Sequence, residues 1–237
     1  AKNECPNISF LKINIAASPN IEKYQSYMEQ YFTVLGNKKI NFFTDISNYL
    51  SYELGQPTHC YDSTKIKDEV ILERSELNDS FITLTGNEIK LTDSNLIFKS
   101  NSEIINLAGV MGGKSTMCDH DTTSAIVECA SFCPESIIGK ALKYDIESDA
   151  AYKFERSVDP ICHEKILRRF IKIASDHVQI KSIEATPFSY NFNQQKLPID
   201  LKKINSILGT NITEDKYKDI LNRLGFVFES SLVVPSW

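Results

Sequence analysis

The hydrophobic pattern begins with one strand and two helices. Residues 8–16, ISFLKINIA, alternate apolar and polar side chains and predict an opening strand. A helix is predicted over 20–35, because its apolar spacing is helical and Gly36 follows it. A second helix is predicted over 45–54, where Gly55 ends the pattern.

The centre of the chain changes to short apolar runs separated by Asn, Asp, Ser and Gly turn formers. Helical spacing returns after them, with a proline at the start of the first run and again near the start of the last. Strands are predicted over 69–75, 80–86, 87–92, 95–99, 103–109 and 124–132, and helices over 134–144, 148–157 and 159–178.

The last two predicted helices have candidate caps and a candidate buried face. Ser148 or Asp149 caps the helix over 148–157, and Asp159 caps the next one. The apolar side chains that recur at helical spacing in that last helix are most simply core residues: Leu167, Phe170, Ala174 and Val178.

Residues 186–199 are polar and bounded by prolines, which predicts a linker. Beyond it the pattern indicates helix, turn, helix and strand, with Thr213 as a cap and with Gly209 and Gly225 as stops. This segment is small for an independent core. We therefore expect a first domain over 1–190 and, over 191–237, a second domain that is cut short.

Composition excludes some classes of protein. The chain has 237 residues, 42% of them hydrophobic, and a net charge of −5, so a sizeable core is expected. Non-specific binding to nucleic acid is not expected, because it needs clustered Lys and Arg. A site that accepts only the end of one RNA stays possible.

The cysteines and the N-terminus favour a cytoplasmic protein. The six cysteines form no CxxC pair, and we expect free thiols in a reducing compartment. No secretory leader or membrane-length apolar run is seen. The segments CDHD (118–121) and HC (59–60) lack the paired spacing of a zinc site, so no metal is expected.

The segment AGVMGGKS (108–115) fits a loose phosphate-loop pattern. A functional phosphate loop leads into a helix, whereas STMCDHDTTS follows here and is dense in turn formers. These features disfavour the nucleotide-binding interpretation, which stays as a third hypothesis that nucleotide binding by a Lys114→Ala variant would test. Gly109, Gly112 and Gly113 are expected to form tight turns or to let a ligand approach the backbone closely.

Longer motifs, taken in order, are more informative than this loop. Together they resemble the B3/B4 editing domain of bacterial phenylalanyl-tRNA synthetase β subunits, over residues 5 to about 188, and residues 197–237 resemble the start of the B5 domain that follows it. The motifs are NYLSYELGQPTHCYD (48–62), NLAGVMGGKST (106–116), AIVECASFCPESIIGKA (125–141) and SDAAYKFERSVDP (148–160).

The resemblance implies a fold and an activity. The fold is a mixed α and β one, a β-sandwich core with a packed helical layer, followed by a small helix-rich fragment. The activity is hydrolysis of tyrosine wrongly attached to tRNA(Phe). An apolar pocket rejects an added hydroxyl only by roughly a hundredfold, so a second site that offers the tyrosine hydroxyl a buried acceptor improves discrimination.

Glu128 matches the family's acceptor for that hydroxyl. It is the one charged residue of the apolar strand AIVECAS, on the same face as Ile126 and Ala130. From the residues alone, this face could meet solvent, or a basic partner could hold Glu128.

The remaining site residues are also implied by the resemblance. Gly109 and Gly112 match glycines that line the amino-acid pocket and offer backbone amides, and otherwise they would be ordinary turn glycines. His59 and Pro57 match a pair beside the ester, where His59 positions a water. A lone histidine is otherwise a surface or core residue.

Asn48 matches a polar pocket residue and would otherwise be a helix-surface amide. Ser148 and Ala150 match a Thr-x-Ala pair whose small size keeps the pocket open, which is compatible with the start of a helix. This sequence differs from the family's usual pattern at several places. Ala108 stands where the family has the first glycine of a Gly-Gly pair, Ser148 replaces Thr, and HCYD replaces His-Ala-Phe-Asp. These differences keep a second hypothesis open, a non-catalytic module that binds tRNA or amino acid or acts in assembly.

The expected partners are the synthetase α subunit in an α₂β₂ enzyme, the 3′ end of tRNA(Phe) and tyrosine. Aminoacylation belongs to the α subunit in this family. We expect ATP and Mg²⁺ to serve that reaction and no cofactor to bind this chain.

Overall fold

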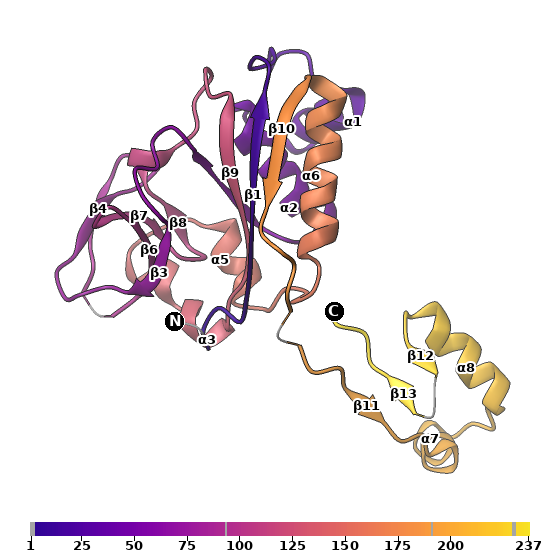
Figure 1. Ribbon diagram of the computed structural model, residues 1–237. Helices are drawn as coiled ribbons and strands as arrows, with labels where there is room; N and C mark the ends of the chain where they lie inside the picture. The colour runs from indigo at the N-terminus through magenta and orange to yellow at the C-terminus, as the bar shows by residue number, and fades with distance from the viewer. Residues whose placement is uncertain (1–2, 93, 191, 229–230) are drawn as a thin grey trace. The chain divides into compact units, whose positions relative to one another are not determined.

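A computed structural model describes residues 3–92, 94–190, 192–228 and 231–237 (Figure 1). The chain divides into two compact units, Ala1–Tyr190 and Asn191–Trp237. Each unit is described by itself.

The first sheet is antiparallel throughout and has the strand order β10-β1-β9-β2. The predicted strands over 8–16 and 124–132 are confirmed as β1 and β9, whereas β2 and β10 are new relative to the sequence prediction. β2 is short and carries polar residues, and most of β10 is exposed, so neither has a clear apolar pattern. The bounds are β1 (Asn7–Ile15), β2 (Thr58–Asp62), β9 (Ser124–Ser131) and β10 (Ile180–Ala185).

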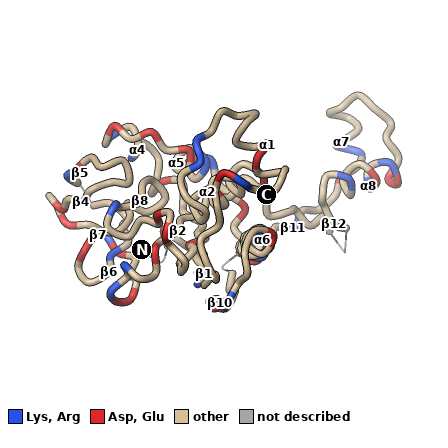
Figure 2. The backbone as a smooth tube through the Cα atoms, turned by 90° about the horizontal axis from the view of Figure 1, so that it is seen from above, with Lys and Arg blue, Asp and Glu red and all other residues tan. Residues whose placement is uncertain are grey.

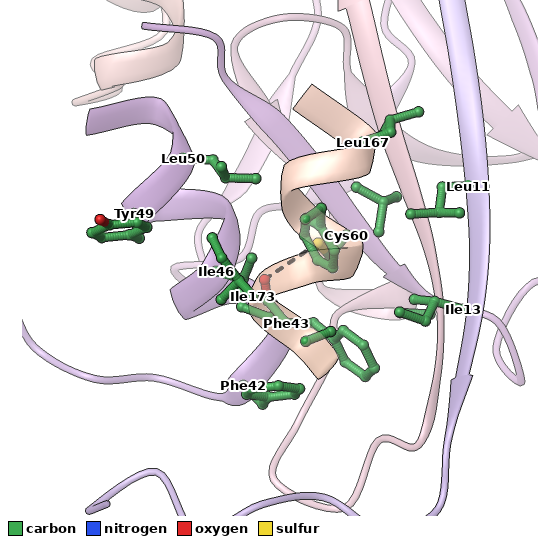
Figure 3. Packing of buried hydrophobic residues seen from close by; sticks show 14 of the residues in the cluster. Leu11, Ile13, Phe42, Phe43, Ile46, Tyr49, Leu50, Cys60, Leu167 and Ile173 are labelled. Atoms are coloured by element: carbon green, nitrogen blue, oxygen red, sulfur yellow. Dashed lines mark hydrogen bonds between the residues drawn. The ribbon is translucent and has the colours of Figure 1, made fainter. Parts of the chain in front are cut away.

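Helices cover one face of this sheet (Figure 1). They are α1 (Ser26–Leu35), α2 (Phe42–Leu54) and α6 (His163–His177). Figure 3 shows apolar side chains of α2 and α6 packed against those of β1 and β2, including the Cys60 thiol, which donates to the Phe43 carbonyl at 3.5 Å. The predicted core face of α6 is confirmed, because Leu167, Phe170 and Ala174 are buried in this cluster and Val178 packs against it.

The second sheet has the order β3-β6-β7-β8, next to a separate β4-β5 hairpin. Side chains from both sheets meet in a second core, for example Tyr61 and Ala130 from the first and Phe98 and Leu107 from the second. The predicted mixed α and β architecture is therefore confirmed. The strands are β3 (Ile71–Arg74), β4 (Ser80–Ile82), β5 (Glu88–Lys90), β6 (Leu96–Ser100), β7 (Glu103–Leu107) and β8 (Met111–Gly112).

Two helix starts in the first half differ from the prediction. α1 begins at Ser26 rather than residue 20, because the Asn20 side chain and carbonyl accept from the amides of Glu22 and Lys23 and hold a turn there. α2 begins earlier than predicted, because Asn41 caps it by accepting from the Thr44 amide at 3.0 Å.

The later helices also differ. The predicted helix over 134–144 is two short ones, α3 (Pro134–Ile137) and α4 (Lys140–Lys143), separated at Gly139 by its φ of 75°. The Asp159 cap was wrong: its carboxylate accepts from the Ile161 amide in a local turn, and α6 begins only at His163. Ser148, not Asp149, caps α5 (Asp149–Phe154).

The second unit contains two helices and short strands within its described residues. Asp200 caps α7 and Thr213 caps α8, and Gly209 ends α7 with a φ of 65°. The elements are β11 (Lys196–Leu197), α7 (Leu201–Leu208), α8 (Glu214–Arg223), β12 (Val227–Phe228) and β13 (Leu232–Val233), with the three strands in one antiparallel sheet.

Charge is spread over the first unit rather than gathered. Figure 2 shows basic and acidic positions interspersed along its backbone. In the described part of the chain, no helix is long and apolar enough to cross a membrane. The same residues contain no cluster of three or more His, Cys, Asp or Glu with the geometry of a metal site.

Candidate functional site

Glu128 lies at the centre of a small polar cluster between the two sheets. On β9 it pairs with Phe10 of β1 on one side and with His59 of β2 on the other. Its face is the one opposite the helices, and only 4% of its surface is exposed. Among the described residues, no Lys or Arg pairs with Glu128. Both open alternatives, a solvent-facing strand and a basic partner, are therefore wrong.

One oxygen of this carboxylate is held by neutral donors. The Tyr61 hydroxyl donates to Oε2 of Glu128 at 2.6 Å. The Asn106 amide nitrogen donates to the Tyr61 oxygen at 2.9 Å and reaches Oε2 of Glu128 at 3.5 Å. We find no hydrogen bond to Oε1 within the described part of the chain.

Burial dominates the ionisation of Glu128. It raises the pKa of the carboxyl to about 7, although the hydrogen bonds from Tyr61 and Asn106 lower that pKa by favouring the charged form. The group is thus poised between its two protonation states near neutral pH. A buried carboxylate with a free oxygen can accept a hydrogen bond from a ligand hydroxyl.

His59 borders the same cluster. Its ring stands edge-on to Tyr61, with centroids 4.5 Å apart. Burial lowers the pKa of His59 to about 4, so the imidazole is neutral at neutral pH. Its Nε2 atom is shielded from solvent and has no hydrogen-bond partner among the residues described. A buried polar atom left without a partner is unusual in a folded protein and indicates a place for a bound group.

Gly112 lets the imidazole lie against the backbone of β8. A Cβ built on Gly112 would come within 2.2 Å of Cε1 and 2.8 Å of Nε2 of His59, so only glycine fits. Gly109 is required for a different reason. It has a φ of 70°, and a Cβ there would come within 2.8 Å of Ile137 and 2.9 Å of Phe132.

The backbone amides of residues 109–113 differ in whether they are available to bind a ligand. Those of Val110 and Gly113 donate to the carbonyls of Leu107 and Ile105, at 2.9 and 2.8 Å. The Gly109 amide makes no hydrogen bond to any described residue. It is therefore free to donate to a bound group.

Ser148 fastens α5 to the loop. Its hydroxyl accepts from the Ala151 amide at 3.1 Å and donates to the Val110 carbonyl at 2.6 Å. Ser148 itself is not in the cavity wall. It acts through α5, which brings Ala150 and Phe154 to that wall.

These groups enclose a cavity of ≈ 60 Å³. A neighbouring hollow of ≈ 450 Å³ shares Pro57, Thr58 and Ala150 with it. Asn48, exposed on α2, lines only the larger hollow, together with Lys38 and Lys153. The cavity wall consists of Pro57, Thr58, His59, Asn106, Gly109, Val110, Met111, Gly112, Glu128, Ala150 and Phe154.

Most of the site residues expected from the sequence are therefore neighbours. His59, Gly109, Gly112, Glu128, Pro57 and Ala150 line one cavity, whereas Asn48 and Ser148 lie outside it. Tyr61 and Asn106 were not among the site residues expected from the sequence. A signal existed for Tyr61, because alternation in THCYD places it on the face of His59, but that required recognising β2 as a strand.

The phosphate-loop pattern is not part of a nucleotide site of the usual kind. Lys114 begins a 3₁₀ helix that ends at Thr116, and no α-helix follows the loop. The helix N-terminus that would face the phosphates is therefore missing from this described segment.

Comparison with known proteins gives a consistent family. The model of the B3/4 domain matches residues 9–179. The phenylalanine–tRNA ligase β subunit of Francisella tularensis is 32% identical over 192 residues, which are 80% of this chain and 24% of that protein. The β subunit of Burkholderia pseudomallei is 33% identical over 211 residues, covering 87% of this chain and 26% of that protein.

The chain thus spans about a quarter of the length of these relatives. Among solved structures, an N-terminal fragment of the phenylalanyl-tRNA synthetase β subunit from Pyrococcus horikoshii aligns with a TM-score of 0.47 and 10% identity, covering 99% of this chain and 66% of that one. On the family match, which takes in the whole cavity wall, the chain belongs to the B3/4 domain family.

Proposed function

We propose that this chain is the editing part of a phenylalanyl-tRNA synthetase β subunit and hydrolyses the ester of Tyr-tRNA(Phe). The observation that carries the proposal is Glu128, a buried carboxylate whose Oε1 accepts no hydrogen bond from any described residue, in the wall of a cavity lined by both polar and apolar residues. A tyrosine hydroxyl satisfies this oxygen. Phenylalanine leaves it desolvated and unpaired, which costs about 1–3 kcal/mol or more for a charged group.

The amino acid and the nucleotide would occupy different spaces. The ring enters the space beside Glu128, where the cavity of ≈ 60 Å³ has to widen, because a benzene ring occupies a cavity of about 150 Å³. The terminal ribose lies in the larger hollow that shares Pro57, Thr58 and Ala150 with it. Lys38 and Lys153 outnumber the one acidic residue, Asp149, in the wall of that hollow, which suits the negative charge of a tRNA end.

The chemistry needs little more than orientation. Water attacks the ester carbonyl, and the tetrahedral intermediate places a negative charge on the carbonyl oxygen. Its collapse breaks the bond between the acyl carbon and the ribose oxygen, which leaves as a hydroxyl with the proton that the water gives up. The unpaired Gly109 amide is the donor we assign to that oxygen, with Gly112 lining the same wall. Neutral His59 lines the same cavity, and its unpaired Nε2, which is covered here, becomes a partner for the attacking water as the cavity widens around the substrate.

The proposal extends to partners and location. The chain acts with a synthetase α subunit in an α₂β₂ enzyme, in the cytoplasm, on the 3′ end of tRNA(Phe). ATP and Mg²⁺ belong to the aminoacylation reaction of that enzyme, which we place outside this chain.

The test is deacylation of Tyr-tRNA(Phe) and Phe-tRNA(Phe) by the assembled enzyme. Glu128→Ala is expected to remove the preference for the tyrosyl ester. Glu88→Ala, which deletes an exposed carboxylate on β5, should leave the preference unchanged. If Glu128→Ala retains the full preference, Glu128 is not the discriminating group, and a wild type without deacylation would leave the non-catalytic module as the better account.

A further inference from the structure

The carboxylate of Glu128 already contacts one phenol, that of Tyr61. Tyr61 is completely buried, and its hydroxyl is fixed from two sides by the 2.6 Å bond to Glu128 and the 2.9 Å bond from Asn106. Glu128 lies in the wall of the substrate cavity, and Tyr61 lies behind it. The two therefore form a tyrosine–carboxylate pair within the protein, of the same chemistry as the proposed contact with the substrate.

We infer that Tyr61 is a positioning residue for tyrosyl-ester hydrolysis: by binding Oε2 of Glu128 it leaves Oε1 as the acceptor for the substrate hydroxyl. This inference rests on the proposed function. It makes specificity a property of the Tyr61–Glu128 pair rather than of Glu128 alone.

The division of the two oxygens follows from their partners. Oε2 takes both protein contacts, from Tyr61 and, at 3.5 Å, from Asn106. A carboxylate offers acceptor sites on both oxygens, so a second phenol can bind Oε1 while Tyr61 stays in place. The edge-on contact with His59 fixes the Tyr61 ring and links the acceptor to the residue that positions water.

Tyr61 also favours the ionised carboxylate. No Lys or Arg balances Glu128 among the described residues, and the groups around it are His59 and the thiols of Cys5, Cys60 and Cys129. Burial raises the pKa of each of these thiols and lowers that of His59, so all are neutral near pH 7. The Tyr61 hydroxyl, supported by Asn106, is thus the main group that stabilises the charge on Glu128.

Tyr61→Phe removes only the hydroxyl and leaves the buried ring, so the fold is retained. Without its donor, the carboxyl of Glu128 takes up a proton at higher pH. The acidic limb of Tyr-tRNA(Phe) deacylation by the assembled enzyme should shift upward by about one pH unit or more, the equivalent of a charge-assisted hydrogen bond. The ¹³C NMR titration of the Glu128 carboxyl should shift in the same direction.

Tyr24→Phe is the matched control. Tyr24 is also buried and donates to a carboxylate, Asp45, at 2.7 Å, but in the helical-layer core and outside the cavity wall. The Tyr24→Phe variant should leave both the pH profile of deacylation and the Glu128 titration unchanged.

Two results would overturn the inference. One is a Tyr61→Phe enzyme whose pH profile and Glu128 titration coincide with those of the wild type. The other is a gain in tyrosyl selectivity in Tyr61→Phe, which would mean that Tyr61 competes with the substrate. A wild type without tyrosyl selectivity overturns the proposed function instead, and in that case the NMR titration still shows whether Tyr61 controls the charge of Glu128.

Discussion

Gly112 sets how closely His59 can approach the backbone of β8. The imidazole occupies the space that any other residue at 112 would fill with its Cβ. The backbone at Gly112 has an ordinary φ, so the requirement is for space and not for conformation. The family resemblance pointed to both residues, but their contact becomes visible only when β2 and β8 are placed on facing sheets.

Gly112→Ala is expected to displace the His59 ring and to destabilise the fold by about 1–3 kcal/mol, the usual cost of overpacking a core. Tyrosyl-ester hydrolysis should fall at the same time. Urea denaturation measures the first effect and deacylation the second.

A double-mutant cycle with His59→Ala separates this contact from other effects of the substitution. If the clash is with the ring, Gly112→Ala costs much less in the His59→Ala background. Equal costs in the two backgrounds would contradict the assignment.

Among the buried residues outside the cavity, His163 is the one for which we expect the clearest effect on the stability of the fold. It is fully buried at the start of α6, with Ser9 near its Nδ1 at 3.2 Å and Ser131 near its Nε2 at 2.9 Å. Burial lowers its pKa to about 4. The ring joins α6 to β1 and β9, and burial penalises its charged form, so the folded state favours the neutral imidazole.

The sign of the pH effect follows from this lowered pKa. Between pH 6.5 and about 4 the unfolded chain binds more protons at His163 than the folded chain, so stability is lost as the pH falls through this range. The loss is on the order of 3 kcal/mol. His163→Gln should flatten the pH dependence of the free energy of unfolding, whereas His120→Gln, at an exposed position, should not. Identical pH slopes for wild type and His163→Gln would refute the claim.

At the scale of elements, α5 depends on Ser148 for both its start and its attachment. Ser148→Ala removes the cap and the bond to the Val110 carbonyl. It should reduce the free energy of unfolding by about 1–2 kcal/mol. Ser148→Thr, which carries the family's usual residue, should keep most of it.

Urea denaturation of the first unit measures this effect. Thr213→Ala is the control, because Thr213 caps α8 in the second unit and should not alter that transition. A Ser148→Ala variant as stable as the wild type would show that α5 is held by its apolar contacts instead.

Some helices and strands could be predicted from their sequences, and others could not. β1 and β9 alternate clearly, and the apolar face of α6 repeats at helical spacing, so pattern alone found them. β2 was missed because its residues, THCYD, do not alternate between polar and apolar. The early end of α3 depends on the backbone conformation at Gly139, which has a φ of 75°. Asp159 failed as a cap because a local turn competes for the same carboxylate.

At the scale of the whole molecule, the site exists because two sheets pack face to face. Glu128 and His59 belong to the first sheet, and Asn106 and Gly112 to the second. The pairing of His59 with Glu128 is fixed by strand register, which single-sequence patterns do not encode. The family resemblance supplied Glu128, His59 and the two glycines of the cavity wall, whereas the Tyr61–Glu128 pair comes only from the folded structure.

The most direct test of the central claim is the ratio of the initial rates at which the wild-type enzyme, with its α subunit, deacylates Tyr-tRNA(Phe) and Phe-tRNA(Phe). The account predicts a ratio of at least about a hundredfold in favour of the tyrosyl ester, because only tyrosine satisfies the buried acceptor on Glu128. A ratio near one, in an enzyme that charges tRNA normally, would contradict it.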